Sequence, residues 1–167
     1  MNKGEFENGI KYNLLFIFIA STTTQPSIIN SNYSSALTTN DGMFMRPAQN
    51  TSNYYYKAIQ IIVDKTGIYN IASLSGLDVN GFLYDDTFNQ SNPSWYLFED
   101  DDDKGGNKQF KLTVHLEAGV PYTLIVSTFY PNYTGPFLVI GEGPGNVRFI
   151  PLNPITTSKL SSEFLYE

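Results

Sequence analysis

The sequence predicts an all-β protein, specifically a jelly-roll-like antiparallel β-sandwich with an N-terminal extension strand. Short apolar runs recur along the chain, separated by turns rich in glycine, proline, asparagine and aspartate. Strands favour aromatic residues, and the chain has 12 Tyr and 12 Phe. Glycine and proline interrupt every candidate helix. We expect an N-terminal apolar strand and Ser/Thr/Asn-rich tether over 1–40, the sandwich over 41–150 and a tail over 151–167.

The N-terminal region contains the strongest apolar run of the chain, residues 14–20. A helix needs about 20 apolar residues to cross a bilayer, so we expect no membrane span here. The run fits the core of a signal peptide, or a strand that folds back on its own domain. It also fits a strand donated to the sheet of a neighbouring copy, because a polar tether follows it. The assembly interface would then be formed by Tyr12, Leu14, Phe16 and Phe18.

The strands of the body follow one another with turn residues between them. The clearest has apolar residues at every second position from Phe110 to Leu116, which predicts a strand with one buried face. In the longest, Ile59, Ile61 and Val63 share a face, and residues 64–67 are expected to form a hairpin turn. The ranges expected as strands are 43–46, 54–63, 68–72, 81–84, 95–98, 110–116, 122–128, 137–140 and 147–150.

Composition and charge exclude several classes of function. The formal net charge of -6 argues against nucleic-acid binding, which requires a basic patch. No cysteine is present, so neither disulfides nor thiolate chemistry can operate. The single histidine, His115, falls on the polar face of its strand, and no nucleophile-elbow pattern accompanies it. We therefore expect a protein that is not an enzyme, with carboxylate-only hydrolysis as the alternative.

Sequons for N-linked glycans point to a secreted, extracellular glycoprotein. The motif Asn-x-Ser/Thr occurs four times, each time in a stretch that resembles a loop. The acceptor residues are Asn32, Asn50, Asn89 and Asn132.

An acidic loop is the strongest candidate for a metal site. Four consecutive carboxylates occupy 100–103 and a Gly-Gly-Asn turn follows them. Neighbouring carboxylates repel each other, so the loop is either a solvated tip or the site of a hard cation such as Ca²⁺. The spacing is not that of an EF-hand, so an aspartate from elsewhere, Asp78 or one of residues 85–86, would have to join. The candidate ligands are Asp78, Asp100, Asp101, Asp102 and Asp103.

A carbohydrate platform is a further alternative for the aromatic residues at 54–56 and 95–96. In a sandwich, however, alternate members of such runs face the core.

The order of these motifs resembles the bacterial-type pre-peptidase C-terminal domain (PPC). The resemblance covers residues 44–150 and rests on 55–63, 67–71, 78–85, 100–107, 110–116 and 118–126. It implies a jelly-roll β-sandwich without catalysis, an extracellular setting and, in some members, calcium and matrix or carbohydrate binding. By motif position, the family's acidic residues fall on Asp78 and on 100–103. The chain departs from the family in having no protease in front and an apolar N-terminal strand.

Two functions follow as expectations. The first is a structural subunit that assembles into a filament by donating its N-terminal strand to a neighbouring copy. The alternative is a calcium-stabilised accessory module that binds carbohydrate or matrix.

Overall fold

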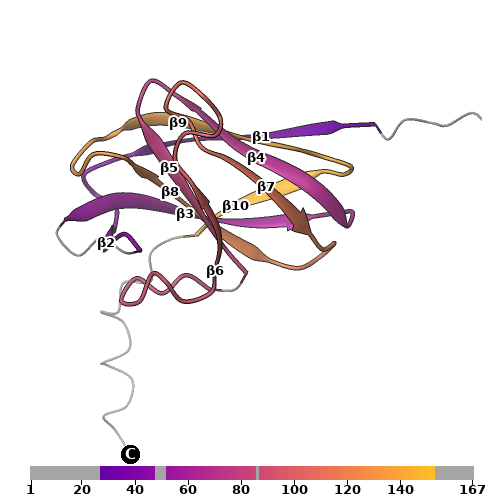
Figure 1. Ribbon diagram of the computed structural model, residues 1–167, viewed down its shortest axis with the longest axis horizontal. Helices are drawn as coiled ribbons and strands as arrows, with labels where there is room; N and C mark the ends of the chain where they lie inside the picture. Colours follow the sequence, from indigo (N-terminus) through magenta and orange to yellow (C-terminus); the bar gives the residue numbers. More distant parts are fainter. Residues whose placement is uncertain (1–26, 48–51, 86, 153–167) are drawn as a thin grey trace, which may run out of the picture.

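The computed structural model describes residues 27–47, 52–85 and 87–152, which form ten β-strands and no helix (Figure 1). The strands make two antiparallel sheets that pack against each other, so the predicted β-sandwich is confirmed. Among the described residues, no helix exists that could cross a membrane. The predicted interface residues Tyr12, Leu14, Phe16 and Phe18, the sequon at Asn50, and residues 153–167 of the tail lie outside the described residues.

One sheet has four strands in the order β1-β9-β4-β7. Their bounds are β1 Ile29–Leu37, β9 Gly135–Gly143, β4 Gly67–Ser75 and β7 Lys111–Leu116. The other sheet has six strands, with β10-β3-β8-β5-β6 in order and β2 paired to β3. Their bounds are β10 Val147–Leu152, β3 Asn53–Val63, β8 Tyr122–Thr128, β5 Val79–Tyr84, β6 Leu97–Asp101 and β2 Met43–Met45.

The main core fills the space between the sheets. Strands with one buried face supply it by alternation, as expected: β3 contributes Ile59, Ile61 and Val63, which are fully buried. Strand β7 and the residue before it contribute four buried side chains in the same way, those of Phe110, Leu112, Val114 and Leu116. Burying each such side chain contributes about 1.5–3 kcal/mol, so this interface carries most of the stability.

A second, smaller aromatic cluster covers the outer face of the six-stranded sheet. Its buried members are Phe44, Tyr54, Tyr56, Phe82, Tyr84 and Ile125. Strand β5 is therefore buried on both faces, because alternate side chains enter the main core and this outer cluster. The outer cluster fixes β2 and the residue after it, Arg46, against the sheet.

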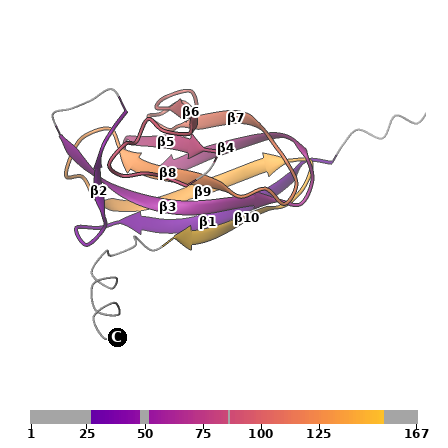
Figure 2. The ribbon, with the colours of Figure 1, turned by 90° about the horizontal axis from the view of Figure 1, so that it is seen from below.

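The sheets are tied together along both sides of the sandwich. On one side β1 runs beside β10 (Figure 2), and the backbone N–H of Val147 donates to Ser31 Oγ at 3.0 Å. On the other side the N–H of Lys111 in β7 donates to Asp101 Oδ2 in β6 at 2.8 Å. Each bridge satisfies a backbone donor at a sheet edge that would otherwise be open.

Three local expectations differ from the structure. The polar stretch expected as a tether contains strand β1, because Ile29–Leu37 pairs along its whole length with β9. The hairpin expected at residues 64–67 is wrong: β3 and β4 belong to different sheets, so the turn crosses between them. There Asp64 accepts hydrogen bonds from the backbone and side chain of Asn146, both at 2.7 Å. The acidic stretch begins inside β6, which runs to Asp101.

Candidate functional site

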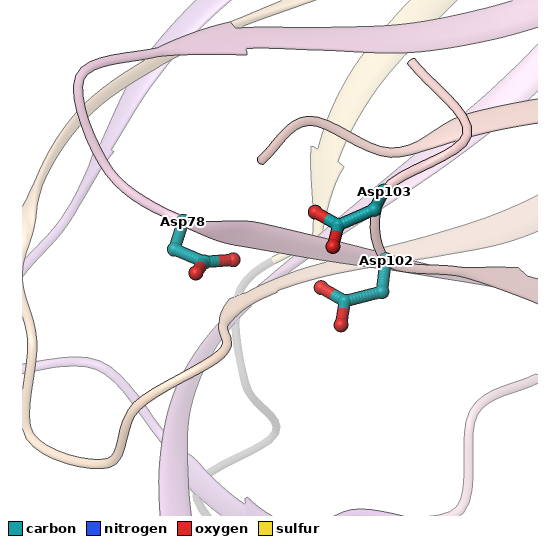
Figure 3. Close-up of side chains that lie close together, drawn as sticks. All are labelled: Asp78, Asp102 and Asp103. Atoms are coloured by element: carbon teal, nitrogen blue, oxygen red, sulfur yellow. The ribbon is translucent and has the colours of Figure 1, made fainter. Parts of the chain in front are cut away.

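Three aspartates from two parts of the chain converge at one end of the six-stranded sheet. Asp78 directly precedes β5, and Asp102 and Asp103 directly follow β6. The two strands are antiparallel, with Gly81 opposite Asp101, so the start of β5 lies beside the end of β6. One carboxylate oxygen from each aspartate lies within 4.8 Å of the others, and the side chains point toward one another (Figure 3).

The other two candidate ligands do not join this cluster. Asp101 is buried, and its Oδ2 accepts hydrogen bonds from the backbone N–H groups of Lys104 and Lys111 at 2.9 and 2.8 Å. It therefore closes the acidic turn and ties β6 to β7. Asp100 is exposed on β6, opposite Phe82 in the register. Of the alternative partners, Asp85 is exposed and residue 86 lies outside the described residues.

The electrostatics of the cluster disfavour three bare carboxylates. Burial, followed by the charges of Asp103 and Asp78, raises the pKa of Asp102, while Arg46 opposes that rise. Asp78 Oδ1 and Asp102 Oδ1 are buried and have no hydrogen-bond partner within the described residues. Such oxygens are destabilising unless a cation or a donor approaches them.

Arg46 supplies a buried positive charge next to the cluster. Its guanidinium donates to the backbone oxygen of Thr128 and lies 4.0 Å from the centre of the Tyr54 ring. Burial lowers the pKa of Arg46, although Tyr54, Asp102 and Asp78 favour its charged form. Its Nε has no hydrogen-bond partner among the described residues.

Asn80 adds another buried oxygen to this end of the sheet. Asn80 is the second residue of β5 and lies two positions after Asp78, so the two side chains share a face. Continuing the register of β5 and β6 by one residue places Asn80 next to Asp102. Its Oδ1 is buried without a hydrogen-bond partner in the described part of the chain.

Gln109 holds the backbone around Asp78 in place. Its buried side-chain amide donates to the carbonyl oxygens of Leu77 and Lys108 at 2.9 and 2.8 Å. Lys108 in turn places its Nζ 3.7 Å from Asp78 Oδ2, on an exposed side chain. The cluster therefore has two positively charged side chains beside it, the buried Arg46 and the exposed Lys108.

The sequence did not point to Arg46, Asn80 or Gln109 as parts of a site. Arg46 carries a weak signal, because it is a lone charge between an apolar strand and Pro47. Asn80 and Gln109 carry none, since single amides are common in turns and strands.

The donor set is of the kind that suits a hard cation. All the unpartnered acceptors are carboxylate or amide oxygens, which are the ligands that calcium prefers. His115 is exposed on β7, which belongs to the four-stranded sheet and not to the six-stranded sheet that carries the cluster. Among the described residues, Asp78, Asp102 and Asp103 form the one group of three or more potential metal ligands within reach of a single ion.

The described sequons occupy different surroundings. Asn32 is exposed in edge strand β1 and not in a loop, whereas Asn132 is exposed in the turn before β9. Asn89 lies in a turn, where its Oδ1 accepts from the N–H groups of Ser91 and Asn92.

The expected aromatic platform is divided by the fold. Tyr54 and Tyr56 are buried in the outer cluster, while Trp95 and Tyr96 are exposed beside β6. They do not form one surface.

Comparisons with known proteins found no family model that matches this chain and no curated protein that matches it. The resemblance to PPC domains stays a prediction.

Proposed function

We propose that this chain is a non-catalytic, secreted β-sandwich module that calcium stabilises and that attaches to extracellular carbohydrate or matrix. The observation that carries the calcium part is the pair of buried, unpartnered oxygens on Asp78 and Asp102, which face each other with Asp103. The start of β5 and the end of β6 supply these groups, so an ion there would add a link between the acidic turn and the sheet.

The residues present fit calcium by number and type of donor. Calcium takes six to eight oxygen ligands, and proteins leave some positions to water. Asp78, Asp102 and Asp103 would hold the ion, with the Asn80 amide oxygen close by. Arg46 limits the affinity, because it already neutralises part of the negative charge.

A binding role is favoured over catalysis by the chemistry of the surroundings. The cluster has no histidine, and its neighbouring polar side chains are an arginine, an asparagine and a lysine. The exposed Tyr130 and Tyr133 line a groove together with Asp78, and aromatic residues are enriched where proteins contact partners.

Thermal unfolding of the full chain with calcium or with EDTA tests this proposal. At a calcium concentration of 100 Kd, binding stabilises by about 2.7 kcal/mol, which is about 5–10 °C in Tm for a chain of this size. Magnesium should give a smaller shift, because it demands tighter octahedral geometry.

Two neighbouring aspartates provide matched variants for this experiment. Asp102→Asn should remove most of the calcium shift, whereas Asp100→Asn should keep it, because Asp100 lies outside the cluster. An unmodified chain whose Tm is the same with calcium and EDTA would refute the calcium site.

A filament subunit is the second candidate. The observation that favours it is an apolar groove at the start of β1, where the chain enters from the N-terminal segment. The groove is lined by Ser27, Ile28, Ile68, Asn70, Glu142, Gly143 and Pro144. Ile28 and Ile68 are largely exposed there, so this end of the four-stranded sheet has apolar surface to offer a neighbouring strand. In this proposal Tyr12, Leu14, Phe16 and Phe18 of another copy cover that surface.

Phe16→Asp separates the two candidates. In a filament subunit this change should leave a folded monomer, because it places a charge in the joint between copies. Asn13→Asp is the control, since it adds the same charge at a polar position of the same segment. Negative-stain microscopy and sedimentation read the result, and a Phe16→Asp variant that still polymerises would exclude strand donation.

A further inference from the structure

A groove beside the acidic cluster combines aromatic rings with charged and polar groups. It has a volume of about 250 Å³ and shares Asp78 with the cluster. Its lining residues are Gly76, Leu77, Asp78, Lys108, Thr128, Tyr130 and Tyr133. Small-molecule pockets are usually about 300–1,000 Å³, so this groove suits a short section of a chain-like ligand.

Two exposed tyrosines form the aromatic wall of the groove. The rings of Tyr130 and Tyr133 have their centroids 5.7 Å apart and are tilted by 42°. Tyr130 also packs edge-on against Phe129, at 4.9 Å between centroids, which holds its ring in position. About half of each tyrosine is exposed, 49% and 55%, so both can accept a ligand.

The lining also includes polar side chains of both signs of charge, which form the polar wall of the groove. Lys108 Nζ lies 3.7 Å from Asp78 Oδ2, which gives a donor and an acceptor within reach of one ligand. The Thr128 hydroxyl donates to the Tyr130 carbonyl at 2.7 Å and holds the backbone of Tyr130 in place.

Both walls are built on backbone held in a costly conformation. Lys108 has φ of 63° and Asn132, between the two tyrosines, has φ of 65°. Non-glycine residues rarely adopt this left-handed region, and such strain concentrates at functional sites. Gln109 supports one wall, because its side-chain amide donates a hydrogen bond to the carbonyl oxygen of Lys108.

We propose that this groove binds a neutral saccharide, with a sugar ring stacked on Tyr130 and Tyr133 and its hydroxyl groups bonded to Asp78 and Lys108. This inference deepens the proposed function and rests on it for the attachment role. Sugar rings present C–H faces that pack on aromatic rings, and vicinal hydroxyls match a carboxylate and an amine placed side by side. The mixed charge of the wall favours a neutral ligand over a strongly anionic one.

The saccharide could come from an external polymer or from the chain itself. Asn132 is a sequon asparagine located between the two tyrosines, and its side chain is exposed. A glycan attached there would start at the edge of the groove. Both sources have the same chemistry, so the experiment separates them.

Affinity electrophoresis with neutral polysaccharides tests the proposal. The full chain is produced without N-glycans and run with calcium through gels that contain laminarin, mannan or hydroxyethyl cellulose. We expect at least one polymer to retard it. Tyr130→Ala and Tyr133→Ala should each weaken this retardation about tenfold, whereas Tyr133→Phe and the exposed control Trp95→Ala should not. Unchanged thermal unfolding shows that the variants fold.

Two results would overturn the proposal. One is a chain that none of the three polymers retards, and the other is equal retardation of the unmodified chain and both alanine variants. A chain made with N-glycans then identifies the source. Weaker retardation that Thr134→Ala restores means that the Asn132 glycan reaches the groove, and unchanged retardation means that the ligand is external.

The outcome is separable from that of the calcium site. Calcium stabilisation without retardation would refute the saccharide groove alone. Retardation that persists in EDTA, together with an unchanged Tm, would refute the calcium site alone.

Discussion

The space between the sheets and the acidic end of the six-stranded sheet bury opposite kinds of groups. The first buries apolar side chains and the second buries polar oxygens, although β5 contributes to both. Between the sheets, Val79 and Leu83 are fully buried among apolar side chains. At the acidic end, Asp78 and Asn80 place oxygens in buried positions with no hydrogen-bond partner among the described residues. The first region stabilises the fold, whereas the second costs free energy unless something binds. The difference is the reason for our proposal that a cation binds at the acidic end, because buried oxygens without partners are unfavourable unless a ligand satisfies them.

The largest expected effect lies between the sheets. Leu83→Ala should destabilise the protein by about 2–5 kcal/mol, because it removes a fully buried side chain and leaves a cavity. Leu74→Ala is the control at an exposed position of β4 and should change stability by less than about 0.5 kcal/mol. Urea unfolding measures both. Equal losses would mean that the main core is not where the structure places it.

The next effect concerns two adjacent aspartates with different roles. Asp101→Ala should cost about 2–3 kcal/mol, since it leaves the backbone N–H groups of Lys104 and Lys111 without their acceptor. Asp100→Ala should be close to neutral at its exposed position. Urea unfolding in EDTA compares them without any contribution of calcium. A larger loss for Asp100→Ala would contradict the assigned bridge between β6 and β7.

Arg46 should have opposite effects on stability and on calcium affinity. Arg46→Gln removes the hydrogen bond to the Thr128 carbonyl and the contact with Tyr54, so stability in EDTA should fall by about 1–2 kcal/mol. It also removes the competing charge, so calcium should bind about tenfold more tightly, or 1.4 kcal/mol. Calcium titration followed by thermal unfolding measures both quantities. Arg148→Gln, at an exposed arginine, is the control.

The smallest expected change in stability is a gain, whereas the variants above lose stability. It concerns Asp102. Burial and the neighbouring carboxylates raise the pKa of Asp102 above its ordinary value of 3.8, so the folded chain holds this proton more tightly than the unfolded chain. Stability from this group is therefore present at low pH and is lost as pH rises through the raised pKa.

Asp102→Asn should accordingly stabilise the calcium-free chain at pH 7, by about 0.5 kcal/mol. The gain should shrink as the pH approaches 3.8, where the aspartate of the unmodified chain becomes protonated. Thermal unfolding in EDTA across this pH range measures the difference. A variant that is less stable than the unmodified chain at pH 7 would show that the carboxylate is satisfied without calcium.

The sequence predicted the sandwich because alternation within a strand is a local property. Residues 110–116 needed no partner to show which side chains are buried, and the structure confirms them. Strand β1 was missed because it lies in a polar stretch: Tyr33 and Ser35 are only half-buried, and Leu37 alone is fully buried. Pairing with β9 is what makes it a strand. Turn 64–67 was misread because a turn sequence does not reveal which sheet the next strand enters.

The sequence predicted that aspartates form the candidate site, but not which of the aspartates lie together. Asp78, Asp102 and Asp103 lie together because β5 and β6 pair, and the register of that pairing cannot be read from the sequence. Asp100 and Asp101 differ in role only because alternation in β6 turns one outward and the other toward β7. Arg46 and Tyr130 could not be assigned, since β2 and the turn before β9 reach the cluster through the fold alone.

Titration of the metal-free full chain with calcium, followed by isothermal calorimetry, tests the central claim most directly. One calcium ion should bind per chain in the unmodified protein and in Asp100→Asn. Binding should weaken at least about tenfold in Asp102→Asn, because one of the three converging carboxylates loses its charge. Absence of binding by the unmodified chain, or identical binding by both variants, would contradict the claim that the acidic end is a calcium site.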